Sequence, residues 1–303
     1  MNADADQLTS HRDELEALRE SLEKRLQNWL PEAPASDRVA QAMREGTLTP
    51  GKRVRPLLLI LAAQDLGDKV AFEGLLDLAC AVEMVHAASL ILDDIPCMDN
   101  AALRRGRPTI HRQFGESVAI LAAVALLSRA YAIVAEAPGL DGERRAAAVS
   151  RLAGAVGLQG LVQGQFLDLS EGGQRRDVDA ILTTNELKTS KLFSATLALA
   201  TLAADADEPA QTALLLFAEE LGQAFQLIDD LADGVMGTGK DLNQDAGKST
   251  LVATLGEAAV RKRLDAHLAR ADAHLATACP QGGRTRAFVE SWFRQQLAVI
   301  GAP

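Results

Sequence analysis

The sequence is poor in aromatic residues and has no region of β-branched strand character. Phe, Trp and Tyr together make up 4% of its 303 residues, while 48% of the residues are hydrophobic. The apolar content is therefore mainly aliphatic and rich in alanine and leucine. Such a composition favours packed helices over a sandwich of β-branched strands. We expect an all-α protein.

Cysteine and positive charge are also scarce. Three cysteines, Cys80, Cys97 and Cys279, are odd in number and lack CxxC spacing, which argues against a disulfide framework or a zinc site and fits a reducing cytoplasm. A formal charge of -10, from 31 Lys and Arg against 41 Asp and Glu, argues against a nucleic-acid partner. Cations are the more natural ligands of such a chain.

The sequence pattern gives no indication of an export signal, of a membrane-spanning segment or of a division into domains. The first six residues are acidic and polar, unlike the basic start of a signal peptide. The longest apolar run, 118–127, is shorter than the roughly 20 residues of a spanning helix, and we expect it to be a core helix. No Ser-, Pro- or Gly-rich linker divides the chain, which predicts one cytoplasmic domain over residues 1–303 with no transmembrane segment.

Two aspartate clusters, DDIPCMD at 93–99 and DDLAD at 229–233, each close an apolar segment of helical character. Two unit charges ~4 Å apart repel by about 1 kcal/mol in water and about 4 kcal/mol at an effective dielectric of 20. Divalent cations relieve that repulsion, and ligand sets made only of oxygen suit Mg²⁺ bound to substrate phosphates. An isolated DDxxxxD motif is more often a surface loop, so the interpretation as a metal site depends on other motifs.

A basic segment supplies a second kind of site. Pro56 is tolerated only in a first helical turn, which predicts a helix from about Arg53 to Leu66 with Lys52, Arg53 and Arg55 at its N-terminus. The helix dipole disfavours cations at this end of a helix. A bound anion such as a phosphate would make the same cations favourable. The alternative is a solvated basic loop.

Polar stripes on two predicted helices lead to the acidic clusters. Glu83, His86, Ser89 and Asp93 are spaced by three or four residues and share one helix face. The second stripe, approaching the other cluster, consists of Gln223, Gln226, Asp230 and Asp233. A lone histidine such as His86 is more often a satisfied core residue. The segment GKST at 247–250 is not a P-loop, because Leu242 replaces its first glycine.

Six motifs in a fixed order carry a resemblance to a known family. They are GKRVRP at 51–56, His86, DDIPCMD at 93–99 with LRRG at 103–106, GQ at 164–165, KT at 188–189 and FQLIDDLAD at 225–233. Together they resemble the trans-isoprenyl diphosphate synthases along nearly the whole chain. Within that family, segments 86–111 and 159–171 are most similar to the bacterial geranylgeranyl diphosphate synthases of carotenoid pathways.

The resemblance implies an isoprenoid synthase-type helical bundle around a deep central cavity, usually in a homodimer. It implies that Mg²⁺ is held against an allylic diphosphate by Asp93, Asp94, Asp99, Asp229, Asp230 and Asp233. It implies that this diphosphate, or the charge developing on it, is supported by Arg104, Lys188, Thr189, Gln226 and Lys240. The residues that match the isopentenyl diphosphate site are Lys52, Arg55, His86 and Arg105, with Arg53 as a further candidate.

The resemblance also implies the reaction. An allylic diphosphate (dimethylallyl, geranyl or farnesyl) ionises, isopentenyl diphosphate adds to the carbocation, and a proton is lost, commonly to the released diphosphate. Small residues at Ala88 and Ser89, one helical turn before the first cluster, leave the cavity open and suggest geranylgeranyl diphosphate as product. Farnesyl diphosphate is the alternative, followed by a terpene cyclase, which needs no basic site, and a noncatalytic partner subunit.

Overall fold

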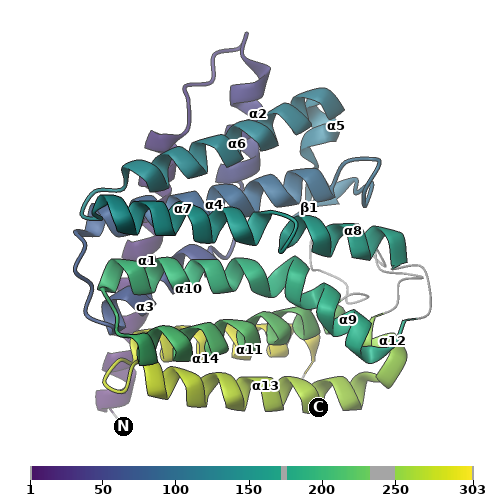
Figure 1. Ribbon diagram of the computed structural model, residues 1–303. Coiled ribbons are helices and arrows are strands. Elements are labelled where there is room, and N and C mark those ends of the chain that lie inside the picture. Colours follow the sequence, from purple (N-terminus) through teal and green to yellow (C-terminus); the bar gives the residue numbers. More distant parts are fainter. Residues whose placement is uncertain (1, 172–175, 233–249, 302–303) are drawn as a thin grey trace.

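The computed structural model describes residues 2–171, 176–232 and 250–301, with side chains from residue 12 onward. Almost all of the described chain is helical (Figure 1). The helices are α1 (Asn2–Trp29), α2 (Arg38–Leu48), α3 (Val54–Asp65), α4 (Phe72–Asp93), α5 (Ile110–Phe114), α6 (Glu116–Glu136), α7 (Gly142–Val156), α8 (Leu161–Glu171), α9 (Val178–Asn185), the π-helix η1 (Glu186–Ser190), α10 (Lys191–Ala204), α11 (Glu208–Ala232), α12 (Leu251–Leu255), α13 (Glu257–Ala278) and α14 (Arg284–Ile300). The strands β1 (Leu103–Arg104) and β2 (Arg107–Pro108) form one short hairpin.

The all-α prediction is confirmed, and so are the main predicted helix ends. Asp37 caps α2, because its carboxylate accepts a hydrogen bond of 2.9 Å from the Ala40 amide. Arg53 is the residue before α3, and Pro56 lies in the first turn of that helix. Helix α1 runs from Asn2 to Trp29, and the next residue but one is Pro31.

The long helices run side by side in stacked layers, with α10 at the centre (Figure 1). Helix α10 packs against α3, α4, α7 and α11. Its sequence, KLFSATLALATLAA, is apolar on every side, as expected for a helix surrounded by others. The layers therefore meet around this helix.

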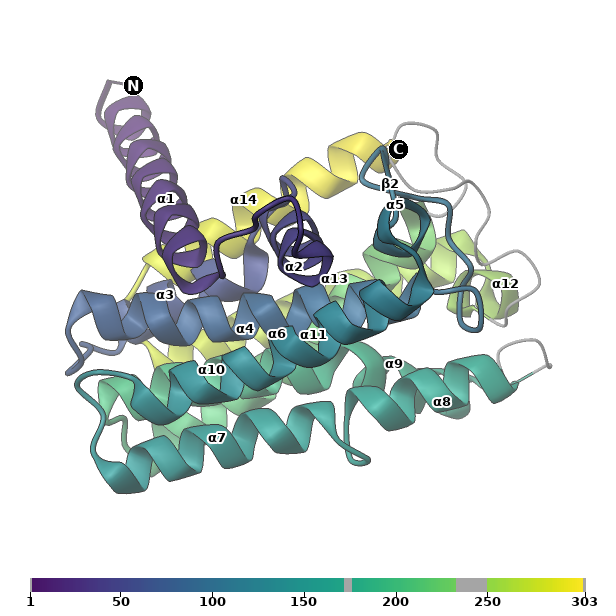
Figure 2. The same ribbon diagram turned by 90° about the horizontal axis from the view of Figure 1, so that it is seen from above.

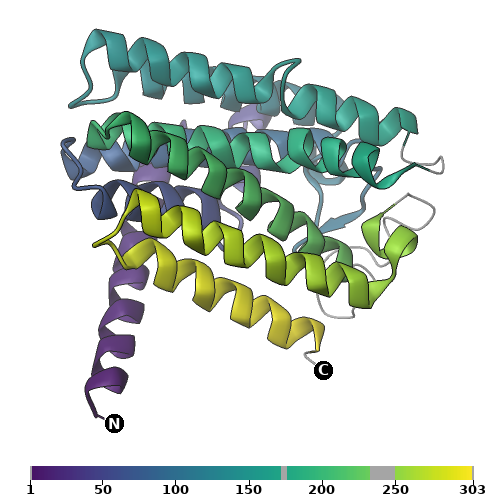
Figure 3. The same ribbon diagram turned by 60° about the horizontal axis from the view of Figure 1, so that its bottom comes forward.

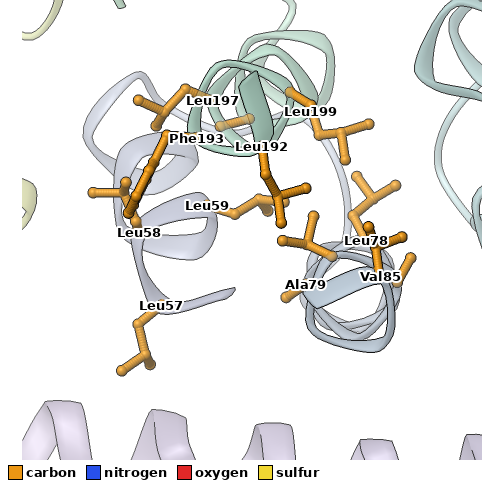
Figure 4. Packing of buried hydrophobic residues seen from close by; sticks show 14 of the residues in the cluster. Leu57, Leu58, Leu59, Leu78, Ala79, Val85, Leu192, Phe193, Leu197 and Leu199 are labelled. Carbon is orange, nitrogen blue, oxygen red and sulfur yellow. The ribbon is translucent and has the colours of Figure 1, made fainter. Parts of the chain in front are cut away.

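Leucines from three helices form the centre of the core (Figure 4). Leu57, Leu58 and Leu59 of α3, Leu78 of α4 and Leu192 of α10 are all buried. Leu59 points towards Leu192 and towards α4, between the three helices. Fully burying one such side chain contributes about 1.5–3 kcal/mol relative to leaving it exposed. Because α3 carries the basic segment and α4 ends at the first acidic cluster, this core fixes both sites relative to each other.

Two helices are long and apolar enough to cross a membrane by length and composition alone, namely α4 and α6. In α4, 78% of the apolar window is buried inside the fold, which is the behaviour of a core helix. In α6 only 39% is buried, and Ile120, Leu121 and Val124 are exposed. The run 118–127, which we expected to be a core helix, is thus buried on one face only.

Helix α1 meets the bundle near its C-terminal end, and its N-terminal part projects from it (Figures 2 and 3). The anchor is a partly buried ion pair: Arg25 donates two hydrogen bonds, of 2.6 and 2.7 Å, to the buried Asp77 carboxylate on α4. The Trp29 indole N–H donates to the same carboxylate. A carboxylate that is 1% exposed needs such partners, because an unpaired buried charge is strongly destabilising.

Candidate functional site

The first acidic cluster lies at the C-terminal end of α4. The helix ends at Asp93, and Pro96, which has no amide hydrogen, follows within one turn. The chain then turns back, so that the Asp99 amide donates to the Asp93 carbonyl over 2.9 Å. Asn100 closes the turn with a positive φ of 49°, a conformation that asparagine tolerates better than most residues. This loop brings Asp99 back beside the end of the helix.

Asp94 is held by an arginine from the short hairpin. The hairpin turn, Arg105-Gly106, has positive φ at both residues (54° and 75°), as a two-residue turn matched to the strand twist requires. Arg104 donates to both oxygens of Asp94, from Nε at 2.8 Å and from Nη2 at 2.6 Å. Burial raises the pKa of Asp94, and Arg104 offsets part of that effect. Arg104 therefore fixes a carboxylate of the first cluster.

Asp93 lies in a different electrostatic setting. Burial raises its pKa to about 6, Lys188 acts in the opposite direction, and Asp99 raises the pKa further. Lys188 is also ion-paired with Asp168 of α8 at 2.7 Å between Nζ and Oδ2. Although burial acts against it, Asp93 and Asp168 raise the Lys188 pKa. Lys188 thus lies between a carboxylate of the first cluster and Asp168.

The predicted Lys188-Thr189 patch lies on the π-helix η1 between α9 and α10. Such π-bulges are frequent at functional sites, because the extra residue redirects side chains. Two glycines allow the neighbouring helices to approach η1 closely. A Cβ at Gly164 of α8 would overlap the Lys188 backbone, and one at Gly222 of α11 would overlap Ser190. Both substitutions would shift η1.

The second acidic cluster ends the described part of α11. Thr189 of η1 donates to the Gln226 side-chain oxygen over 3.0 Å, and the Gln226 amide donates to Asp230 over 2.9 Å. Asp229 and Asp230 lie in the last turn of the helix. The hydrogen-bond chain joins η1 to the second cluster. The remaining predicted residues, Asp233 and Lys240, lie outside the described residues.

The donors fit Mg²⁺ only together with an anionic ligand. Within residues 2–171, 176–232 and 250–301, no three Asp, Glu, His or Cys side chains converge to form a metal site by themselves. Mg²⁺ typically takes one or two carboxylates, keeps several waters and completes its shell with substrate phosphates. Burial raises the pKa of Asp93, and the neighbouring carboxylates of Asp99 and Asp94 add to that effect, so a bound cation would favour its ionised form.

A cluster of arginines surrounds His86 one to two turns before the acidic end of α4. Burial lowers the His86 pKa well below its usual value, and Arg55, Arg105, Arg104 and Arg53, in that order, lower it further. His86 is therefore neutral at pH 7 and can donate or accept a hydrogen bond. The concentration of positive charge at the start of α3 is what an anion site requires.

Arg53 and Arg55, two residues apart, are held differently. Arg53 is 4% exposed and forms an ion pair with Glu83 at 2.5 Å, while it also donates to the Thr49 carbonyl. Arg55 lies over the Phe193 ring at 4.4 Å, and burial lowers its pKa to about 10. Among the described residues, the buried Nε atoms of both Arg53 and Arg55 lack a hydrogen-bond acceptor, so the Glu83 ion pair of Arg53 is what distinguishes the two. Arg55 therefore matches a ligand-binding cation, and Arg53 a structural one.

Lys52 and Arg105 complete the basic side. Lys52 is exposed and its ammonium group lies 5.3 Å from the centre of the Trp292 ring. Arg105 lies against Gly51, where a Cβ would overlap the guanidinium, and its Nη1 is within 3.5 Å of the Thr49 and Pro50 carbonyls. Both side chains thus flank the N-terminus of α3, where the sequence predicted an anion.

The predicted chain-length residues lie within α4. Ala88 is fully buried in the core, and the half-buried Ser89 donates its hydroxyl hydrogen to the His86 carbonyl over 2.9 Å. A larger side chain at Ala88 would displace its neighbours, at a typical cost of about 1–3 kcal/mol. The two positions therefore differ in how easily they accept a bulky residue.

Several residues of the site had no signal in the sequence. Asp168 follows Gly164 by one helical turn, so the GQ motif marks its helix but not its pairing with Lys188. Gly222 precedes Gln226 by one turn, and only the close approach of Ser190 explains it. Trp292 lies some 240 residues after its contact Lys52, too far for any local pattern to connect them.

The fold is all-helical, with acidic clusters at the ends of α4 and α11 and a group of arginines around His86. The family model for polyprenyl synthetases matches residues 36–277, and the chain belongs to that family.

Relatives and solved structures agree with this assignment. A geranylgeranyl diphosphate synthase from Pantoea ananas is 57% identical over 95% of this chain and 96% of its own. One from Pseudescherichia vulneris is 55% identical over 96% and 94%, respectively. The crystal structure of a geranyltransferase from Helicobacter pylori, in complex with magnesium and isoprenyl diphosphate, covers 96% of this chain and 97% of its own, with 27% identity and a TM-score of 0.83.

Proposed function

We propose that the chain is a Mg²⁺-dependent geranylgeranyl diphosphate synthase that extends allylic diphosphates with isopentenyl diphosphate. The accepted starters are dimethylallyl, geranyl and farnesyl diphosphate. The observation that carries the proposal is the pairing of a compensated acidic cluster, Asp94 with Arg104, with a separate cationic cluster around His86. Relatives that are 57% and 55% identical carry the name geranylgeranyl diphosphate synthase, which supports the product assignment.

On the acidic side, the chain holds the allylic diphosphate between α4 and α11. Bound Mg²⁺, held by Asp93, Asp94, Asp99, Asp229, Asp230 and Asp233, would act as a Lewis acid on the leaving diphosphate. Lys188 and Arg104 add positive charge on the side of the first cluster, where negative charge builds up as the carbon–oxygen bond breaks. Gln226 and Thr189 orient the second cluster. Lys240 completes this proposed set.

On the cationic side, Lys52, Arg55 and Arg105 bind the diphosphate of isopentenyl diphosphate, and the neutral His86 adds a hydrogen bond. Arg53 supports them through its pairing with Glu83. Fixing this substrate beside the allylic carbocation turns the condensation into an effectively unimolecular step. The double bond of isopentenyl diphosphate adds to the carbocation, a new carbon–carbon bond forms, and the released diphosphate takes the proton that is lost.

We also propose a cytoplasmic homodimer built from one domain per chain. Ile120, Leu121 and Val124 form an exposed apolar strip on α6, with exposures of 41%, 55% and 53%. A strip of this kind is costly in water and is suited to an interface between protein chains. Light scattering should give twice the mass of 32.2 kDa, and Leu121→Glu should shift the protein towards monomer.

The product assay tests the proposed function. Purified protein is incubated with Mg²⁺, labelled isopentenyl diphosphate and each allylic starter, and the dephosphorylated products are separated by chromatography. A dominant twenty-carbon alcohol is expected. A fifteen-carbon product would identify a farnesyl diphosphate synthase, a cyclic hydrocarbon from one allylic substrate a terpene cyclase, and an inactive protein a partner subunit.

Substitution of Ala88 tests the position of the cavity floor. Ala88→Phe should shift the product from twenty to fifteen carbons, because the ring blocks growth one turn before Asp93. Since Ala88 is fully buried, Ser89→Phe at the half-buried neighbouring position provides a second variant with less strain. If neither variant shortens the product, the floor of the cavity lies elsewhere.

A further inference from the structure

One aromatic cluster contains one of the two tryptophans of the chain and three of its eight phenylalanines. Phe225 of α11 stacks on Trp292 of α14, with ring centres 3.9 Å apart and planes tilted by 16°. Phe193 lies 4.7 Å from Phe225 on one side, and Phe293 contacts Phe225 and Trp292 edge-on. In a chain so poor in aromatic residues, such a concentration beside the cationic site is notable.

Both ends of this cluster carry a cation of the proposed isopentenyl diphosphate site. Arg55 lies over Phe193 at 4.4 Å, and Lys52 lies over Trp292 at 5.3 Å. Lys52 also donates a hydrogen bond to the side-chain oxygen of Gln296, one turn after Trp292 on α14. The last helix of the chain therefore contacts the first cation of the GKRVRP segment. Helix α14 packs against α3 and α11, which is how these distant residues meet (Figure 3).

We propose that Trp292 and Gln296 are positioning residues of the isopentenyl diphosphate site, and that the C-terminal helix α14 completes this site by fixing the Lys52 ammonium group. The inference rests on the proposed function and assigns a task to residues that no sequence motif of the site contains. Neither side chain is proposed to contact a reacting atom. They act through Lys52.

The chemistry of lysine explains why such a support matters. Its ammonium group sits on a flexible four-carbon chain, so an exposed lysine loses considerable side-chain freedom when it binds a phosphate. Trp292 attracts the ammonium group through the face of its ring, and Gln296 accepts one of its three N–H hydrogens. The ring contact leaves the N–H hydrogens of the ammonium group as donors, because a ring face offers no oxygen to them. Preorganisation of this kind improves affinity by reducing the entropy lost on binding.

The residues that hold Lys52 differ from the residues that hold the second acidic cluster. Phe225 precedes Gln226, which is hydrogen-bonded to Thr189 and Asp230 on the acidic side. Loss of the Trp292 ring removes the contact with Lys52, whereas no atom of that ring takes part in these hydrogen bonds. The effect of changing α14 should therefore appear in the Michaelis constant for isopentenyl diphosphate and much less in that for the allylic substrate.

Steady-state kinetics of four variants test the proposal. Trp292→Leu and Gln296→Ala should raise KM for isopentenyl diphosphate, by about tenfold and about threefold respectively, and should change KM for farnesyl diphosphate by less than about twofold. Trp292→Phe, which keeps a ring under Lys52, should restore most of the loss. Leu297→Ala is the matched control, because it weakens the packing of α14 without touching Lys52.

A double-mutant cycle separates positioning through Lys52 from a general loss of structure. In a Lys52→Ala background, Trp292→Leu should cause no further rise in KM for isopentenyl diphosphate. Additive effects, or an equal rise in Leu297→Ala, would overturn the proposal, as would unchanged kinetics in both Trp292→Leu and Gln296→Ala. Failure of the wild-type protein to condense the substrates would instead count against the proposed function itself.

Discussion

The acidic and the cationic sides of the site hold their charges in opposite ways. On the acidic side, charged groups of the protein meet charged groups: Asp94 is clamped by Arg104, and Lys188 is paired with Asp168. On the cationic side, Arg55 and Lys52 lie on the faces of Phe193 and Trp292, and the oxygen that Lys52 contacts belongs to the neutral side chain of Gln296 and not to a carboxylate. Arg53, the third cation of the segment, is the exception because it pairs with Glu83.

The difference reflects what each side has to bind. Salt bridges on the acidic side reduce the repulsion among carboxylates before any metal arrives. Aromatic rings attract a cation without offering it an oxygen, so they do not compete with a diphosphate for the same hydrogen-bond donors. An arginine that lies on a ring can therefore still donate its N–H groups to an anion, whereas an arginine in a salt bridge already donates some of them to a carboxylate.

The largest expected effect is on the acidic side. Asp93→Asn should lower kcat by about 10³-fold, because several kcal/mol of stabilisation of the leaving diphosphate depend on this cluster. Burial raises the Asp93 pKa, so above pH 6 the ionised carboxylate destabilises the metal-free fold, and the neutral asparagine should leave the melting temperature unchanged or higher. Kinetics and thermal unfolding check both points. Asp265→Asn, at an exposed position of α13, is the control, and an active Asp93→Asn enzyme would refute the assignment.

The second prediction contrasts two arginines. Arg55→Met should raise KM for isopentenyl diphosphate by about 10²-fold while keeping or increasing stability, because it removes a desolvated charge whose pKa is lowered to about 10. Arg53→Met should instead lower the free energy of unfolding by about 3–5 kcal/mol, because it leaves Glu83 buried without its partner. Urea unfolding and kinetics distinguish the two. The contrast fails if Arg55→Met is the less stable variant.

The third prediction concerns the support of η1. Gly164→Ala should lower kcat by about tenfold, because its Cβ would displace the backbone that presents Lys188. Gly154→Ala on α7 is the matched control, since a Cβ there meets nothing and alanine is the better helix former by about 1 kcal/mol. Opposite shifts in melting temperature are expected for the two variants. Equal kinetics in both would show that η1 tolerates displacement.

The helix ends and the shared helix faces of the site could be predicted from the sequence, because residues close together in the chain determine them. Pro56 fixed the start of α3, Pro96 marked the end of α4, and the spacing of His86 and Asp93 placed them on one face. The family resemblance added the roles of these residues. Both kinds of inference depend on short segments whose conformation is set by their own side chains.

Side-chain contacts between segments far apart in the chain could not be predicted from the sequence. The pattern could not separate Arg53 from Arg55, because burial against Glu83 or Phe193 decides their tasks. The π-helix η1 packs closely against α8 and α11, and its own sequence does not indicate these contacts. Apolar content likewise predicted a helix at 118–127 but not that Ile120, Leu121 and Val124 remain exposed.

The most direct test of the central contrast is the metal dependence of binding on the two sides. Calorimetry is performed with isopentenyl diphosphate and with a non-ionisable farnesyl thiodiphosphate, each in Mg²⁺ and in EDTA. Isopentenyl diphosphate should bind with nearly the same affinity in both buffers, because Lys52, Arg55 and Arg105 supply the charge. The farnesyl analogue should lose its binding in EDTA. A loss of isopentenyl diphosphate binding in EDTA, or metal-independent binding of the analogue, would contradict the assignment of the two sides.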